Sequence, residues 1–287
     1  MNNISVMTVM APDYKLEDLV PLMKKIGYDA IEPAIGYKKA LWDTNSQWHI
    51  SIDKLEDDLR NLKKLGDANG IKICSLASGA PMADPVVLER FLAAAAAVGC
   101  PCVRVGPPGY DGKTKYKDLL EKAIKNMEGV EKLSKKHKVK SVFETHMHNI
   151  IPSASAAYRM VSNFDPDYIG IVYDPANGMV EGWEDFGVDL LDKYIAHVHI
   201  KNLSWVPDKD GQVDYFCDGR WRWVFSGVNA GVTNWSKVIK ALKAINYGHA
   251  ISFEDFEGGY CKIPEGITTE EKLKRDFNDL QNLLKET

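Results

Sequence analysis

Ionisable residues follow four apolar stretches in the second half of the chain. The relevant segments read FETH at 143–146, YDPAN at 173–177, HVHIKN at 197–202 and SFEDF at 252–256. Together they offer three carboxylates, on Glu144, Asp174 and Glu254, beside an imidazole. A single Glu at a strand end is usually a capping or ion-paired residue. Three crowded carboxylates, in contrast, repel one another unless a cation binds between them. The pattern therefore predicts one divalent ion, and this ligand set suits Mn²⁺, Mg²⁺, Co²⁺ or Zn²⁺.

A site of this composition suits proton abstraction next to the carbonyl of a sugar. The C–H bond there is a very weak acid, and a cation at the carbonyl and the neighbouring hydroxyl stabilises the enediolate that forms. A carboxylate or imidazole within hydrogen-bond reach removes the proton. Returning the proton to the other face gives an epimer, and placing it on the next carbon gives an isomer. Expulsion of a β-substituent gives an elimination.

Other side chains in these segments are candidates for contact with a substrate. His146 shares a face with Glu144, one step further along the strand, where a catalytic base would stand. The alternative is a histidine that is only hydrogen-bonded at the rim. Lys201 and Asn177 are expected to bind substrate oxygens, although a solvated lysine is an open alternative for Lys201. For His197 we expect a structural or supporting role.

Tryptophans form a second signal. Six of the seven fall in segments that follow predicted strands, and Trp42 and Trp205 are the two expected to contact substrate. Loops usually avoid large exposed aromatic side chains, so these residues are expected to stack on a sugar or aromatic ligand, or to form a protein interface. Packing of the long segment around Trp205 on itself is the alternative.

The elements that must position these residues alternate regularly. Amphipathic helices end near Gly or a small residue and lead into short apolar strands, which is typical of parallel sheets covered by helices. We expect eight strands that form a single (β/α)₈ TIM barrel over residues 1–287. In such a barrel the active site lies at the carboxyl ends of the strands. A doubly wound open sheet is the alternative, but no Gly-x-Gly-x-x-Gly follows the first strand. The eight predicted strands are Ile4–Met10, Ala30–Pro33, Ile71–Ala77, Cys102–Val105, Lys140–Thr145, Ile169–Tyr173, Ile195–Ile200 and Ala250–Glu254.

Composition excludes several classes of protein. The 287 residues contain 36 Lys and Arg against 40 Asp and Glu, so no excess of positive charge points to nucleic acid as a partner. The five cysteines are scattered, which indicates free thiols in a reducing cytoplasm. The chain begins without the features of a signal peptide, and no apolar run is long enough to span a bilayer. We therefore expect a cytoplasmic protein with no membrane contact.

The segments FETH, YDPANG, HVHIKN and SFEDF resemble the xylose isomerase-like barrels, which include sugar-phosphate isomerases and ketose 3-epimerases. The resemblance extends over the whole chain and implies a TIM barrel. Two departures argue against a ketose 3-epimerase in the narrow sense. Asn177 stands where those epimerases have a His, and Ile150 stands where they have a second Glu. By this resemblance the metal ligands are Glu144, Asp174, His199 and Glu254, and Glu144 and Glu254 also form the acid/base pair.

Within that family the chain is similar to the barrel subunit of C-glycoside deglycosidases. This resemblance implies cleavage of 3-keto-C-glycosides by elimination, with His146 as the base and Mn²⁺ as the favoured ion. It also implies a small β-rich partner subunit and an oligomer. The alternative is an isomerase or epimerase acting on a free ketose or a sugar phosphate. Less favoured are a non-catalytic binding barrel and a metal-dependent phosphodiesterase of the endonuclease IV type, whose richer histidine set and basic face are missing from the sequence.

Overall fold

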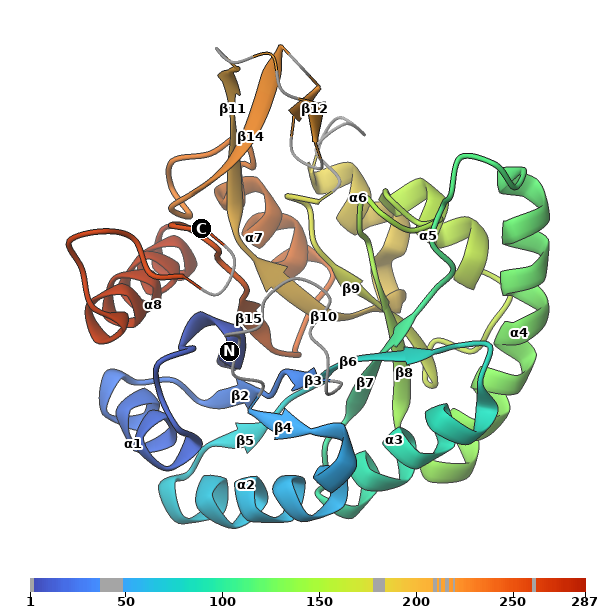
Figure 1. Ribbon diagram of the computed structural model, residues 1–287, viewed down its shortest axis with the longest axis horizontal. Coiled ribbons are helices and arrows are strands. Elements are labelled where there is room, and N and C mark those ends of the chain that lie inside the picture. Colours follow the sequence, from blue (N-terminus) through green and yellow to red (C-terminus); the bar gives the residue numbers. More distant parts are fainter. Residues whose placement is uncertain are drawn as a thin grey trace.

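A computed structural model describes residues 3–36, 49–177, 184–208, 211, 213–214, 217–218, 220–259 and 262–287. Parallel strands form a nearly closed ring, and helices surround it (Figure 1). The order around the ring is β5-β2-β1-β15-β10-β9-β8-β7-β6. These strands are β1 (Ile4–Met7), β2 (Ala30–Glu32), β5 (Lys72–Ile73), β6 (Leu76–Pro81), β7 (Cys102–Gly106), β8 (Lys140–Glu144), β9 (Ile169–Tyr173), β10 (Ile195–Ile200) and β15 (Ile251–Phe253).

The two ends of this sheet belong to one stretch of chain. The predicted strand Ile71–Ala77 is divided into β5, which pairs with β2, and β6, which pairs with β7. Because only two residues separate β5 from β6, the chain itself closes the ring. The predicted (β/α)₈ barrel is therefore confirmed. The first strand is shorter than predicted, since Thr8–Met10 form a 3₁₀ helix, η1.

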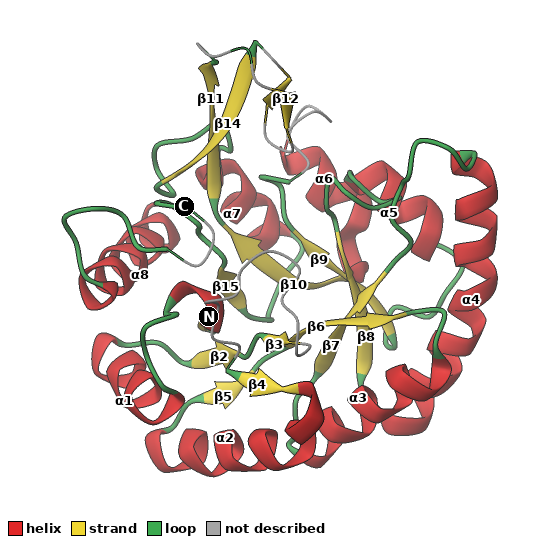
Figure 2. Cartoon of the chain, in the orientation of Figure 1, coloured by secondary structure: helices red, strands yellow, loops and turns green. Residues whose placement is uncertain are grey.

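Eight helices lie on the outside of the ring in the described part of the chain (Figure 2). Each contacts the next, and the last contacts the first, so the outer layer is also continuous. The remaining short elements are β3 (Ile35–Gly36), β4 (Ile50–Ser51), η2 (Ile52–Lys54) and η3 (Asp192–Tyr194). The helices are α1 (Leu16–Ile26), α2 (Leu55–Asn69), α3 (Pro85–Ala97), α4 (Tyr116–His137), α5 (Ala154–Val161), α6 (Glu184–Leu191), α7 (Trp235–Ala244) and α8 (Thr269–Glu286).

Apolar spacing explains why these helices pack on the sheet. In α2, Leu55, Leu59 and Leu62 recur at intervals of three and four residues, and all three are buried. Inside the ring, Val142 and Val172 pack together with residues from β7 and β10. These two valines lie two residues before Glu144 and Asp174. Because side chains alternate between faces along a strand, a carboxylate two residues after an inward valine also points into the barrel.

A small antiparallel sheet projects from the barrel between β10 and α7 (Figures 1 and 2). The sequence analysis placed no strands in this long segment around Trp205, and the structure shows four. Six consecutive residues of β11 pair with β14, and Trp205 lies opposite Trp223. Its strands, in the order β11-β14-β13-β12, are β11 (Asn202–Pro207), β12 (Val213–Asp214), β13 (Cys217–Asp218) and β14 (Trp221–Ser226).

Asn202 ties the base of this sheet to the barrel. Its side-chain amide donates hydrogen bonds to the carbonyl oxygens of Val228 and Thr233, and its Oδ1 accepts one from the backbone N–H of Thr233. A Cβ atom on Gly231 would lie only 2.2 Å from the Asn202 Oδ1, so a side chain at this position would disrupt the anchor. In the described part of the chain, no helix combines the length and apolar character needed to cross a membrane.

Candidate metal centre

Four side chains converge at the carboxyl ends of neighbouring strands. One ligand atom from each lies within 4.8 Å of those of the others, and all four residues are buried. Glu144 ends β8, Asp174 follows β9, His199 lies in β10 and Glu254 follows β15. These strands are adjacent in the ring, so residues up to 110 positions apart in the sequence meet at one rim. We call Glu144, Asp174, His199 and Glu254 the ligand cluster.

The imidazole of His199 supplies a test of whether a metal ion fits. Its Nδ1 is buried and has no hydrogen-bond partner among the described residues. Carboxylate oxygens of Glu144 and Glu254 nevertheless lie 3.4 and 3.3 Å away. A buried nitrogen without a partner is costly, and one surrounded by carboxylates is typical of ligands that share a cation. The ligand cluster therefore fits a divalent ion.

The acidic groups of the cluster have unequal environments. Burial raises the pKa of Asp174 to about 6, against the opposing effect of Lys201. Burial acts in the same direction on Glu254, but Lys201 and His199 hold its pKa at about 2. For Glu144, Arg104 and His199 outweigh burial and keep the pKa well below the ordinary value. The cluster is therefore rich in negative charge at neutral pH, as a metal site requires.

Lys201 and Arg104 are the cations beside the ligands. Lys201 is buried, and its Nζ lies 2.6 Å from an oxygen of Asp174 and within hydrogen-bond distance of Glu254. The solvated alternative for this lysine is wrong. Arg104 donates from Nη1 to Glu144 and from Nε to the carbonyl oxygen of Ser78. Both cations hold the carboxylates in place, and a substrate contact by Lys201 stays a prediction.

Asn177 lies directly beside the ligands. Its amide nitrogen is within hydrogen-bond distance of Glu144, at 3.1 Å, and of Asp174, at 2.9 Å. Its backbone N–H also donates to Asp174. The hydroxyl of Thr145 accepts a hydrogen bond from the backbone N–H of Asp174. In this structure the Asn177 amide nitrogen orients two ligands, and the predicted contact with substrate is not tested.

His146 lies near the ligand cluster, in the segment after β8. The ring is half-buried, and the charges of Glu144, Glu254 and Lys201 act on its pKa. Burial lowers the pKa of His146, so the ring is neutral at neutral pH, as a base must be. Its Nδ1 lies 3.3 Å from the backbone nitrogen of His148, which donates to it. That contact favours a proton on Nε2, so action as a base through Nε2 requires the other tautomer.

Glu32 at the end of β2 was missed by the sequence analysis. It is completely buried, and its carboxylate lies 3.0 Å from Nε2 of His197 and 3.1 Å from Nε2 of His199. Burial acts to raise the pKa of Glu32, but the two imidazoles hold it well below the ordinary value. The supporting role expected for His197 therefore has a partner. A readable signal existed, because Glu32 ends a strand that is otherwise apolar.

The tryptophans are divided between the small sheet and the barrel. Trp205 is 41% exposed and Trp221 is 47% exposed. Trp235, at the start of α7, is buried and donates from its indole nitrogen to the carbonyl oxygen of Lys201. Trp42 lies outside the described residues. The expected exposed aromatic surface is thus present on the small sheet, and its contact with a ligand stays a prediction.

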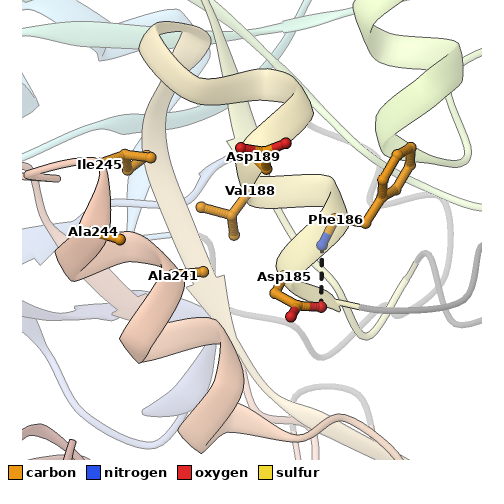
Figure 3. Close-up of a pocket in the computed structure, with 7 residues that line it drawn as sticks. All are labelled: Asp185, Phe186, Val188, Asp189, Ala241, Ala244 and Ile245. Atoms are coloured by element: carbon orange, nitrogen blue, oxygen red, sulfur yellow. Dashed lines mark hydrogen bonds between the residues drawn. The ribbon is translucent and has the colours of Figure 1, made fainter.

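A separate hollow lies on the outer layer between α6 and α7 (Figure 3). It has a volume of about 470 Å³, and Val188, Ala241 and Ile245 are among its lining residues. The carboxylates that line it, on Asp185 and Asp189, are exposed. Because none of the ligand cluster lines this hollow, it is a groove between helices and not part of the metal centre.

Comparison with protein families decides the wider relationship. The model of the family described as xylose isomerase-like TIM barrel matches residues 20–278. The chain belongs to the xylose isomerase-like TIM barrel family. The match spans all four residues of the ligand cluster and all the strands that carry them. Comparison with curated protein sequences finds no match.

Solved structures share the fold over nearly the whole chain. The IolI protein with a bound zinc atom is 18% identical, with a TM-score of 0.73, and the match covers 99% of this chain and 98% of that one. The 3-keto-D-glucoside 4-epimerase YcjR from E. coli is 13% identical, with a TM-score of 0.70, over 98% and 100%. A D-psicose 3-epimerase determined with D-fructose is also 13% identical, with a TM-score of 0.70, over 98% and 99%. At these identities the likeness shows the fold.

Proposed function

We propose that this protein is a divalent-metal-dependent enzyme that abstracts a proton next to the carbonyl of a keto-sugar. The observation that carries the proposal is the buried, unpartnered Nδ1 of His199 among three carboxylates. The names of the structurally similar proteins support it, since an epimerase of 3-keto-D-glucoside and one of D-psicose are among them. A zinc atom in the IolI structure supports the metal.

A divalent ion bound by the ligand cluster would supply Lewis-acid stabilisation of the negative charge that develops on the substrate oxygens. The chain's own residues do the rest. Glu144 and Glu254 approach His199 from strands on either side of β10, so one can accept a proton while the other is positioned to return it. Lys201 and Arg104 keep these carboxylates ionised and fixed in place. Burial of the cluster limits the access of water to the reacting carbon.

For the specific reaction we propose cleavage of 3-keto-C-glycosides by elimination, with His146 as the base. In this reaction His146 takes a proton from C2 of the 3-keto-sugar and the electron pair moves toward the carbonyl. The C1–C2 double bond then forms as the bond from C1 to the aglycone breaks, and the aglycone carbon leaves with that electron pair and takes up the proton held by His146. The half-buried, neutral ring of His146 beside Glu144 supports this assignment. Exposed Trp205 and Trp221 offer flat surfaces for an aromatic aglycone. The second candidate is an isomerase or epimerase of a free ketose, in which Glu144 and Glu254 transfer the proton.

We also propose that the small sheet contacts a partner chain, with a small β-rich subunit as the expected partner. Trp205 and Trp221 are each more than 40% exposed on one small sheet. This supports an interface, because the surfaces of monomeric proteins seldom display large aromatic side chains together. An oligomer that uses this sheet would shield both rings, so this proposal is the alternative to stacking of Trp205 and Trp221 on the aglycone. Light scattering and co-purification would identify it, and a monomer with no partner at high concentration would contradict it.

The test is a proton-exchange experiment on purified protein of known metal content. We expect about one Mn²⁺, or another divalent ion, per chain, and incorporation of solvent deuterium at the carbon beside the carbonyl of a 3-keto-C-glucoside. Release of aglycone would identify elimination, whereas exchange on free ketoses alone would identify the epimerase. Absence of metal together with activity that resists EDTA would contradict the proposal.

A further inference from the structure

Glu32 reaches the centre from the other side of the barrel interior. In the ring, β1 and β15 lie between β2 and β10, yet the Glu32 carboxylate contacts both histidines of β10. Its exposed fraction is 0%, and those of His197 and His199 are 1% and 0%. Burying an ion cluster is a poor way to gain stability, because desolvation offsets the attraction. The arrangement therefore calls for a role beyond packing.

The two nitrogens of His199 face different partners. Nε2 is 3.1 and 3.3 Å from the two oxygens of Glu32, whereas Nδ1 faces Glu144 and Glu254. A carboxylate accepts hydrogen bonds and cannot donate them when ionised, so Glu32 requires a proton on Nε2. With a proton held on Nε2, Nδ1 is the nitrogen whose lone pair can bind a cation in the ligand cluster. Glu32 thus decides which nitrogen of His199 can bind a cation.

His197 holds Glu32 in this position. Its Nε2 is 3.0 Å from the same carboxylate oxygen, and its ring meets that of His199 edge to face at 5.3 Å. With two imidazole partners, the carboxylate cannot rotate away from His199 without losing both contacts. The edge-to-face packing also restricts rotation of the His199 ring itself. His197 therefore acts on the metal centre only through Glu32 and through packing.

We propose that Glu32 is a positioning residue for His199, and that Glu32, His197 and His199 form a hydrogen-bonded support and not a second metal site. This inference rests on the proposed metal binding by the ligand cluster. The three residues do have ligand atoms close enough to share an ion. However, their contacts of 3.0–3.1 Å are ordinary hydrogen bonds, and Nε2 of His199 is already used in one.

Metal affinity of variants tests the proposal. Glu32→Gln removes the negative charge and one of the two acceptor oxygens, which weakens the hydrogen bonds to both imidazoles. We therefore expect it to lower affinity for Mn²⁺ or Zn²⁺ by about 10- to 100-fold, measured by competition with a chelator. Asp276→Asn is the matched control, because it replaces another buried carboxylate outside the centre, and it should leave affinity unchanged. His197→Gln keeps the contact between Glu32 and His199, so it should lower metal affinity by less than Glu32→Gln does.

Three results would overturn the inference. The first is wild-type affinity in Glu32→Gln, and the second is an equal loss in the Glu32 and His197 variants. The third is two metal ions per wild-type chain with one remaining in Glu32→Gln. A wild-type protein that binds no metal contradicts the proposed function and is recognised separately from these results.

Histidine ¹⁵N spectra of the wild-type protein decide the matter even if the variants do not fold or no metal binds. We expect the Nε2–H of His199 as a slowly exchanging, low-field signal in the metal-free protein, because it is buried against Glu32. In the zinc-loaded protein the proton should stay on Nε2. Absence of that signal, or zinc on Nε2, would overturn the proposal.

Discussion

Glu254 and Asp255 are neighbours in the sequence, yet they belong to two buried clusters of different character. Glu254 joins the ligand cluster inside the barrel rim, whereas Asp255 turns outward to Lys272 of α8, with Nζ at 3.0 Å. Asp276, one turn along α8, lies 2.6 Å from the same Nζ. We call Asp255, Lys272 and Asp276 the helix-anchor triad. Both sets contain buried carboxylates that contact a lysine.

The difference lies in what is left without a partner. In the helix-anchor triad, Lys272 lies between both carboxylates, and Arg275 adds a second cation at Asp276. In the ligand cluster, three carboxylates surround an imidazole nitrogen with no hydrogen-bond partner among the described residues. A set whose charges are matched can serve structure alone. A set with converging lone pairs and an unpartnered nitrogen is suited to a cation.

We expect the largest difference in turnover between variants of the sequence neighbours Glu254 and Asp255. Glu254→Gln removes a ligand oxygen and a proton-transfer group, so we expect it to abolish turnover, as Glu144→Gln should. Asp255→Asn changes the adjacent carboxylate and should leave both turnover and metal content near those of the wild type, with lower stability. Retention of more than about a tenth of wild-type kcat/KM in either Gln variant would show that its assigned role is wrong.

His146→Ala should give the next largest effect and would refine the description of the centre. If His146 transfers the proton but is not a ligand, kcat should fall by about 10²–10⁴. Metal content should not change, because all four ligands remain. Turnover and metal stoichiometry are measured on a 3-keto-C-glucoside and on free ketoses. Loss of metal would place His146 among the ligands, and full activity on a free ketose would assign proton transfer to Glu144 and Glu254.

Lys272→Met should affect stability and not chemistry. Removing one partner of a buried ion pair costs about 3–5 kcal/mol, and Arg275 offsets part of this at Asp276, so we expect the lower end of that range in the free energy of unfolding. Denaturant unfolding gives the change, and metal analysis should still find one ion per chain. A variant that loses its metal would mean that the two clusters are not independent.

The smallest effect concerns pH. Burial raises the pKa of Asp276 to about 6, with Asp255 acting in the same direction and Lys272 and Arg275 against it. In an unfolded chain an Asp titrates near about 3.9, so the folded protein holds the extra proton between these values. The contribution of this group to stability is therefore complete below about pH 4 and is lost as the pH rises through about 6.

The matching measurement compares Asp276→Asn with the wild type by urea unfolding at several pH values from 4 to 7. The advantage of the wild type over the variant should shrink as the pH rises. An advantage that grows with pH would show that the cations, and not burial, control Asp276. In that case neighbouring cations would control the pKa of Asp276, as they control those of Glu144 and Glu254 in the ligand cluster.

The outline of the barrel and the presence of ionisable groups at its rim were readable from local features of the sequence, whereas the resemblance to the family identified the four ligands among them. Apolar runs predict buried strands, and polar residues directly after them must lie at the rim of a parallel barrel. This reasoning places Glu144, Asp174 and Glu254 at one rim with the histidines of β10, the resemblance selects His199, and the structure brings these four residues together. The small sheet was missed, because β12 and β13 are only two residues long and the sheet depends on cross-strand pairing that no local pattern specifies.

The supporting contacts depend on the way in which the barrel closes. Glu32 and His199 are 167 positions apart, and Arg104 and Glu144 are 40 apart. Whether such side chains meet depends on the tilt and stagger of the strands and on the rotamers inside the barrel, and no local pattern encodes these. Residue types and their positions at strand ends are enough to identify the groups that could bind a metal ion. Closure of the ring fixes which nitrogen of His199 faces the other ligands and which carboxylate holds it there.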